Sequence, residues 1–259
     1  MRDSAIDTDR RWTGGRNEGT TIMTSTEAEA ASAAAAASVP AGRRQLYRIA
    51  GLGGVGVFVA WAAQPVIVSI MSPGAPENGR DFAHIESTPF LGVMEAIVFS
   101  GIGVAMLFMV TAVGQLTVSA GSPSTAARVG HLLGVLSGIA WFFVAGLSLA
   151  LYTSIGFHLG EAAPQQELQQ GLYQLHAVVL GGLIGPYMLG VIGWLVMLST
   201  AGRRTGVIGW PLAIVCIIAV GVMVATAFVP FAPPWGSLAG IGVALMLGIA
   251  FLVKARRAD

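Results

Sequence analysis

The sequence predicts an all-α integral membrane protein, a bundle of six transmembrane helices with both termini in the cytoplasm. Three observations predict this fold: the composition, six long apolar runs and an uneven distribution of basic residues. Apolar residues make up 54% of the 259 residues and charged residues only 10%, whereas an average soluble chain has roughly 25% charged residues. So few charges cannot cover a surface that faces water. The formal net charge of +1 indicates no attraction to nucleic acid, which is not an expected partner.

The N-terminal segment, residues 1–44, differs from the rest of the chain. It combines scattered charges with an alanine-rich tract at 27–42, and it has too little periodic apolar surface to offset the entropic cost of ordering. We expect a disordered, Ala-rich cytoplasmic tail over 1–44 and a transmembrane domain over 45–259. Met23 is an alternative start, which would place residues 1–22 upstream of the true start. The first apolar run begins too late and is too long for a signal peptide.

Six apolar runs are long enough, or nearly so, to cross a membrane, because about 20 apolar residues in a helix span the hydrocarbon core. The second, third and fourth runs are longer than needed and are expected to tilt or protrude. The sixth is the shortest. The predicted spans cover residues 46–71, 89–120, 129–157, 172–200, 207–229 and 237–253.

Basic residues in the connections predict the orientation, because they concentrate on the cytoplasmic side of membrane proteins. One side of the predicted bundle has only Arg80, together with five acidic residues. The abundance of Arg, Ala and Gly is typical of a GC-rich bacterial genome, so we expect the bacterial plasma membrane. The other, cytoplasmic side has nine basic residues: Arg43, Arg44, Arg48, Arg128, Arg203, Arg204, Lys254, Arg256 and Arg257.

Glycines at four-residue intervals predict where the helices pack, because close backbone approach favours helix association in lipid. Such glycines form a stripe on the third span and recur on the fourth. The stripes are expected to be seams within one bundle or, alternatively, an interface between copies of the chain. The glycine cluster GLGGVG at 51–56 lies inside a span and is also interpreted as a packing feature. The glycines of the two stripes are Gly130, Gly134, Gly138, Gly181 and Gly185.

Pro65 and Pro186 lie inside the first and fourth predicted spans. Each proline removes a backbone donor, so a kink is expected at both positions. Interrupted helices at corresponding positions of two halves mark binding sites in some transporters. The halves of this chain show no convincing similarity to each other, so ordinary kinked packing is the alternative.

Glu95 is the one acidic side chain inside a predicted span. It lies about 9 Å from the outer end of its helix, where an ionised carboxylate is costly unless it faces protein or a water-filled cavity. His176, Gln64 and Tyr152 fall at nearly the same depth on three other spans. We expect these four residues to form a polar cluster near the outer surface, centred on Glu95 and His176. The cluster would be either an interhelical hydrogen bond or a site for a ligand or proton.

No metal or cofactor site is expected from the sequence. Histidines and acidic residues on the outer side lack a diagnostic spacing such as HExxH, and the histidines there are poorly placed to ligate a transmembrane haem. Cys216 is the only cysteine, which excludes an intrachain disulfide and a cysteine-based metal cluster. The residues considered for an outer site are His84, Glu86, His158, Glu161 and His176.

Two segments carry a resemblance to a known group. They are RRQLYRIAGLGG at 43–54 and GPYMLGVIGWLVMLSTAGRRTGVIGWPLAIV at 185–215. The chain resembles uncharacterised bacterial six-helix integral membrane proteins that are grouped as a domain of unknown function. This resemblance implies a six-helix fold, but it offers no catalytic residues that could be carried over to this chain and leaves the function open. It does not extend to the alanine-rich tail.

The short connections and scarce embedded charges favour a non-enzymatic accessory, sensory or scaffold component of the membrane. A small transporter or permease that uses Glu95 and His176 is the alternative, and a membrane redox or metal-binding subunit is the third. The expected partners are the lipid bilayer and either a second copy of the chain or another membrane protein.

Overall fold

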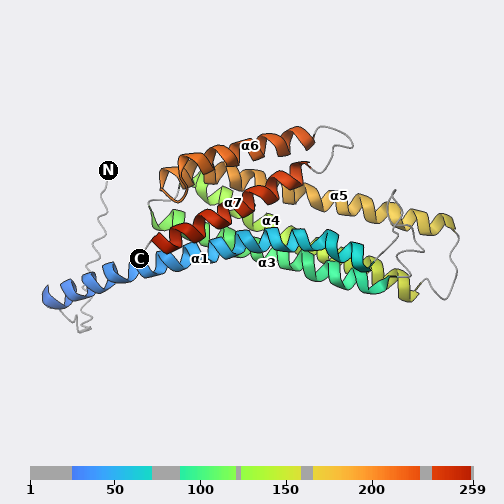
Figure 1. Cartoon of the computed structure of the whole chain (residues 1–259), viewed down its shortest axis with the longest axis horizontal. Helices are drawn as coiled ribbons and strands as arrows, with labels where there is room; N and C mark the ends of the chain where they lie inside the picture. Colours follow the sequence, from blue (N-terminus) through green and yellow to red (C-terminus); the bar gives the residue numbers. More distant parts are fainter. Residues whose placement is uncertain (1–24, 72–87, 121–123, 159–165, 228–234, 258–259) are drawn as a thin grey trace, which may run out of the picture. The chain divides into compact units, whose positions relative to one another are not determined.

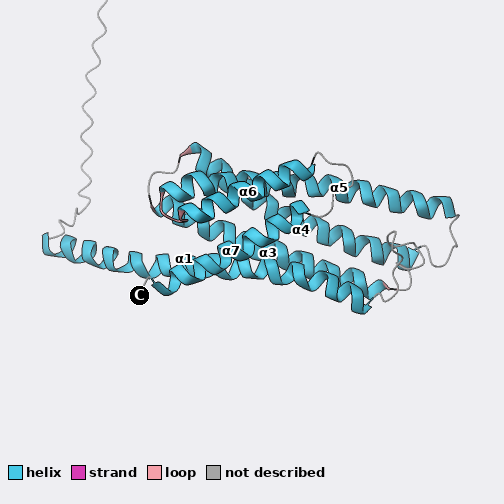
Figure 2. Ribbon diagram, turned by 45° about the horizontal axis from the view of Figure 1, so that its top comes forward, coloured by secondary structure: helices cyan, strands magenta, loops and turns pink. Residues whose placement is uncertain are grey.

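The computed structural model describes residues 25–71, 88–120, 124–158, 166–227 and 235–257, and every regular element within them is a helix (Figures 1 and 2). Five of these helices are long and apolar enough to cross a membrane, while the apolar part of α6, Trp210–Thr226, is shorter. The chain is therefore a multi-pass membrane protein. In order, the helices are α1 (Ser25–Met71), α3 (Pro89–Ser119), α4 (Thr125–His158), α5 (Gln166–Met197), the π-helical η1 (Leu198–Gly202), α6 (Trp210–Ala227) and α7 (Trp235–Arg257).

The chain divides into two units, residues 1–39 and 40–259. In the first unit the described residues, 25–39, are helical. The disorder that the sequence predicts over 1–44 stays a prediction. The alanine-rich composition of this segment is also compatible with a helix, because alanine has the highest helix propensity of all residues. All packing described below lies within the second unit.

Two helix ends coincide with the ends of predicted apolar runs. α1 ends at Met71 and α3 begins at Pro89, as the sequence predicts, because the turn-forming residues between them favour neither helix nor strand. Pro89 suits the first turn of a helix, where its missing N–H has no partner to lose. α5 continues without interruption into η1, where the backbone widens to a π-helical turn before the short connection to α6.

The glycine cluster of α1 lies where this helix crosses two others. A Cβ on Gly53 would lie 2.6 Å from the carbonyl oxygen of Ala105 in α3. A Cβ on Gly54 would lie 2.5 Å from the carbonyl oxygen of Ala244 in α7, and Gly248 of α7 faces the same crossing. Only glycine allows two backbones to approach so closely, which is the main source of helix association in lipid.

The predicted glycine stripe of α4 lies against both neighbouring helices. A Cβ on Gly130 would collide with Met197, and a Cβ on Gly134 would lie 2.8 Å from the indole of Trp194, both on the α5 side. A Cβ on Gly138 would lie 2.8 Å from a leucine side chain of α3. The stripe thus provides surface complementarity at two interfaces.

The corresponding positions of α5 behave differently. A Cβ on Gly185 would meet nothing within 4 Å, so this glycine is not at a close contact. The surroundings of Gly181 lie outside the described part of the structure. Another glycine of α5, Gly190, takes the packing role, because a Cβ there would lie 2.5 Å from the carbonyl oxygen of Leu133 in α4. Pro186 lies inside α5, which continues on both sides of it.

Aromatic side chains fill the centre of the bundle. Trp141 of α4 contacts Trp61 of α1, Phe99 of α3 and Tyr187 of α5, with ring centroids separated by 5.4, 5.6 and 4.8 Å. The rings of Trp61 and Tyr187 stand nearly edge-on to Trp141, an arrangement that the quadrupoles of aromatic rings favour. A void of only about 20 Å³ remains, bordered by Trp141, Tyr187 and Trp194. The core of the bundle is therefore closely packed.

The crossing of α1 and α7 leads to a stability prediction. In Gly248→Ala, the new Cβ would lie 2.8 Å from the backbone nitrogen of Val55, so the helices must separate and the free energy of unfolding should fall by about 1–3 kcal/mol. Gly242→Ala is the matched control on the same helix, because a Cβ there meets nothing within 4 Å. Cys216 is the only cysteine and is buried, so a thiol-reactive dye reports unfolding in detergent during heating. Equal unfolding midpoints for both variants would contradict the prediction.

Candidate functional site

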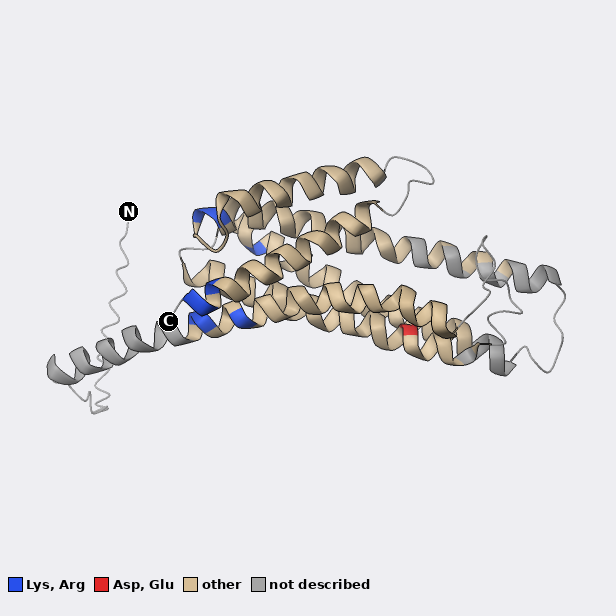
Figure 3. Ribbon diagram, in the orientation of Figure 1, with Lys and Arg blue, Asp and Glu red and all other residues tan. Residues whose placement is uncertain are grey.

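Glu95 lies on the inner side of α3, and only 4% of its surface is exposed. It is the only acidic residue whose side chain the structure describes, and it lies far from the basic residues (Figure 3). The first turn of α3 begins at Pro89, six residues before Glu95, so the carboxyl group lies about 9 Å along the helix. A carboxyl group at such a depth is a functional-site candidate in a membrane protein.

Tyr152 of α4 lies beside this part of α3. Its side chain is 1% exposed and covers Gly92, where a Cβ would collide with the tyrosine. Gly92 and Glu95 are three residues apart and therefore neighbours on one side of α3. Two of the four residues of the predicted polar cluster, Glu95 and Tyr152, thus lie at adjacent levels of one helix interface.

Gln64 belongs to α1, which packs against Tyr152. Ile67, Val68 and Met71 of α1 pack against the small apolar cluster that contains Tyr152. Gln64 is half-buried and lies one turn before Ile67 and Val68, so it shares their part of α1. The structure therefore brings together the helical segments that carry Glu95, Tyr152 and Gln64.

His176 is the fourth residue of the predicted cluster. Its backbone belongs to α5, but its side chain lies outside the described part of the structure. The contact between His176 and Glu95 therefore stays a prediction. The residues considered for an outer metal site, including His84 and His158, also lie outside the described side chains.

The opposite end of the bundle is basic. The nine lysines and arginines whose side chains the structure describes gather there, at the start of the second unit's part of α1, the start of α4, the α5–α6 connection and the end of α7 (Figure 3). We call this region the basic end. It is the side for which the sequence predicts a cytoplasmic location.

Lys254 connects three elements at the basic end. Its Nζ donates hydrogen bonds to the carbonyl oxygens of Gly206 and Val207, at 2.8 and 2.9 Å, in the connection before α6. The same ammonium group lies 5.6 Å from the ring centroid of Tyr47 in α1, within the range of a cation–π contact. The φ of Gly206 is +71°, a left-handed conformation that glycine adopts without steric cost. These contacts hold the α5–α6 connection against the ends of α1 and α7.

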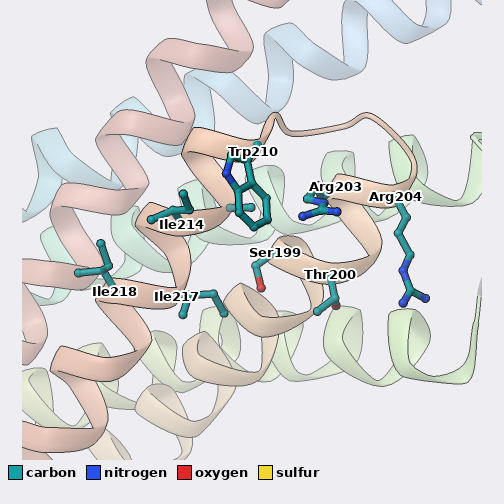
Figure 4. Close-up of a pocket in the computed structure, with 9 residues that line it drawn as sticks. Ser199, Thr200, Arg203, Arg204, Trp210, Ile214, Ile217 and Ile218 are labelled. Atoms are coloured by element: carbon teal, nitrogen blue, oxygen red, sulfur yellow. The ribbon is translucent and has the colours of Figure 1, made fainter.

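Two grooves open at the basic end. One, which we call the Arg203 groove, has a volume of about 450 Å³ and lies between the end of α5 and the start of α6 (Figure 4). Its lining includes Ser199, Thr200, Arg203, Arg204, Trp210 and Ile214. The second, the His131 groove, has a volume of about 610 Å³ and is lined by Gln115, Arg128 and His131, among others.

Neither groove was predicted from the sequence. The sequence does contain a signal for the Arg203 groove. Trp210 follows Arg203 by seven residues, and three isoleucines on one side of a helix come next. The spacing alone places the arginines and the isoleucines on two elements. Only the short connection between α5 and α6, which the structure shows, brings the two sets together.

No family model, curated protein or solved structure matches the chain. The resemblance to six-helix proteins of unknown function stays a prediction from the two segments that carry it.

Proposed function

We propose that the chain crosses the bacterial plasma membrane six times and that the basic end lies in the cytoplasm. The gathering of basic side chains at one end of the bundle supports this orientation. The sixth crossing would be α6, which contacts α7. Its apolar part is short, whereas the span that the sequence predicts over 207–229 is long enough for a crossing.

The orientation is tested with single cysteines in a chain that carries Cys216→Ala. Ala126→Cys places the thiol on an exposed position at the start of α4, close in sequence to Arg128, whereas Ala162→Cys places it in the connection before α5. A membrane-impermeant maleimide should label Ala162→Cys on intact cells and label Ala126→Cys only after the cells are opened. Labelling of both variants on intact cells would contradict the proposed orientation.

Within this topology, we propose a non-enzymatic accessory or scaffold function. The observation that carries the proposal is the packing of the centre of the bundle, where aromatic rings and glycine contacts leave a void of only about 20 Å³. Such a void is too small for a solute larger than water. A closely packed bundle resists deformation, which suits a protein that presents fixed surfaces to membrane partners.

A scaffold component should belong to a larger assembly in its native membrane. We expect the tagged full-length chain, gently solubilised from the source bacterium, to migrate on native gels as an assembly much larger than the purified chain in the same detergent. Coexpression of two differently tagged copies separates homo-oligomers from assemblies with other proteins. Migration as a single copy from native membranes would contradict the scaffold function.

A proton-coupled transporter is the second candidate, and the burial of Glu95 favours it. An acidic side chain that is 4% exposed on a membrane-length helix is expensive to retain, and in transporters such residues carry protons. Pro65 and Pro186 would then provide flexible points in α1 and α5, because each leaves a carbonyl of the preceding turn without its donor.

Gradient-driven uptake into proteoliposomes distinguishes the two functions. For a scaffold, we expect no uptake driven by an imposed proton gradient, and no difference between wild type, Glu95→Gln and His176→Ala. Gln174→Ala, at an exposed position of α5, is the control for His176→Ala. Uptake by wild type and Gln174→Ala that disappears in folded Glu95→Gln would establish the transporter instead.

A further inference from the structure

The Arg203 groove combines a charged part with an apolar part. The guanidinium carbon of Arg203 lies 4.4 Å from the ring centroid of Trp210, in the geometry of a cation–π contact. Figure 4 shows Arg203 beside the indole, with Ser199 and Thr200 on the adjacent turn and the isoleucines of α6 on the other side. This contact holds the guanidinium beside the indole and leaves the N–H groups that face away from the ring available for an anion.

The charged part lacks a compensating acid among the described side chains. Arg203 and Arg204 are both exposed, and the only acidic side chain described is Glu95. Glu95 is buried in the part of α3 that contacts Tyr152 of α4, and it does not line this groove. The groove therefore presents two positive charges to a ligand, and the guanidinium group matches the geometry of a phosphate.

The turn beneath the arginines offers acceptors as well. In and beside η1, the hydroxyl of Ser199 donates to the carbonyl oxygen of Val196 at 2.8 Å, and the hydroxyl of Thr200 donates to the same oxygen at 2.9 Å. Because their protons point to the backbone, both hydroxyl oxygens can accept hydrogen bonds from a ligand. A head group that carries hydroxyl groups as well as a phosphate would use both sets.

The apolar part of the groove continues along α6. Ile214, Ile217 and Ile218 line it and are 42%, 49% and 61% exposed. Their spacing of three and four residues puts them on one side of the helix. From Trp210 to Ile218 this surface extends about 12 Å, away from the connection and along a helix that packs in a membrane bundle. A free phosphate would not contact this surface, whereas an acyl chain would.

We propose that the Arg203 groove is a binding site for one anionic phospholipid of the surrounding membrane. Arg203 and Arg204 bind the head-group phosphate, Trp210 lies at the level of the glycerol, and the isoleucines of α6 contact an acyl chain. Basic pockets between membrane helices bind anionic head groups by the same electrostatic attraction. The proposal adds a ligand to the scaffold function and does not depend on it.

Fluorescence quenching tests the site in the full-length chain. The protein is reconstituted in phosphatidylcholine vesicles in which a minority of the lipid is phosphatidylglycerol, and bromine is placed on the acyl chains of one lipid or the other. The difference between wild type and Trp210→Phe isolates the emission of Trp210. We expect brominated phosphatidylglycerol to quench Trp210 more strongly than brominated phosphatidylcholine. Both leaflets contain both lipids, so the result does not depend on the orientation of the protein.

Paired charge variants provide the matched control. Arg203→Gln with Arg204→Gln should weaken the relative association of phosphatidylglycerol by about fivefold for each arginine, given about 1 kcal/mol for each basic residue near an anionic surface. Arg256→Gln with Arg257→Gln removes the same charge from exposed positions at the basic end and should change the quenching of Trp210 little. Each pair is measured with and without Trp210→Phe.

Three results would overturn the proposal. Equal quenching of wild-type Trp210 by both brominated lipids would show that the groove has no preference for an anionic lipid, and this measurement needs no charge variant. An equal loss in both charge pairs would show a general attraction of the basic end. If inorganic phosphate relieved the quenching of Trp210 by brominated phosphatidylglycerol as effectively as unbrominated phosphatidylglycerol does, the groove would be a site for free anions. A failed scaffold assay with intact lipid preference would leave this site established.

Discussion

Close backbone approach at glycines is the constraint on which the rest of the bundle depends. At the crossing of α1 and α7, Gly54 and Gly248 face each other so closely that neither has room for a Cβ. The hydrophobic effect does not drive helices together in lipid, so the dispersion energy of these close contacts takes its place. The crossing brings the start of the second unit's part of α1 to the end of α7, where Tyr47 contacts Phe251 with ring centroids 6.0 Å apart. The basic end is assembled as a consequence.

The two ends of the bundle then differ in chemistry. Toward one end, Glu95 and Tyr152 are buried at the interface of α3 and α4, so polar atoms are available only to other parts of the protein or to a proton. At the basic end, most of the charged side chains are exposed, and Arg128, Arg203 and Arg204 line grooves. The first arrangement suits internal stabilisation or proton storage. The second suits ligands that arrive from the membrane surface.

Length and composition were sufficient to predict the helices, because an apolar run of a given length has one stable conformation in lipid. The glycines were less informative, since Gly134 and Gly185 have the same spacing in sequence but only Gly134 meets a neighbour. Which side of a helix faces a partner depends on the tertiary arrangement. For the candidate site, equal depth placed Glu95 and Tyr152 near each other, whereas the Arg203 groove depended on a π-helical turn that no spacing predicts.

The position of η1 explains why a lipid site would form at this place. A π-helical turn at the end of α5 widens the backbone, and such turns occur often at functional sites. Here Ser199 and Thr200 satisfy the carbonyl oxygen of Val196, so their hydroxyls stabilise the widened turn and need no further acceptor. Lys254 fixes the following connection through Gly206 and Val207. Arg203 is therefore held between two fixed elements before any ligand binds, and preorganisation of this kind reduces the entropic cost of binding.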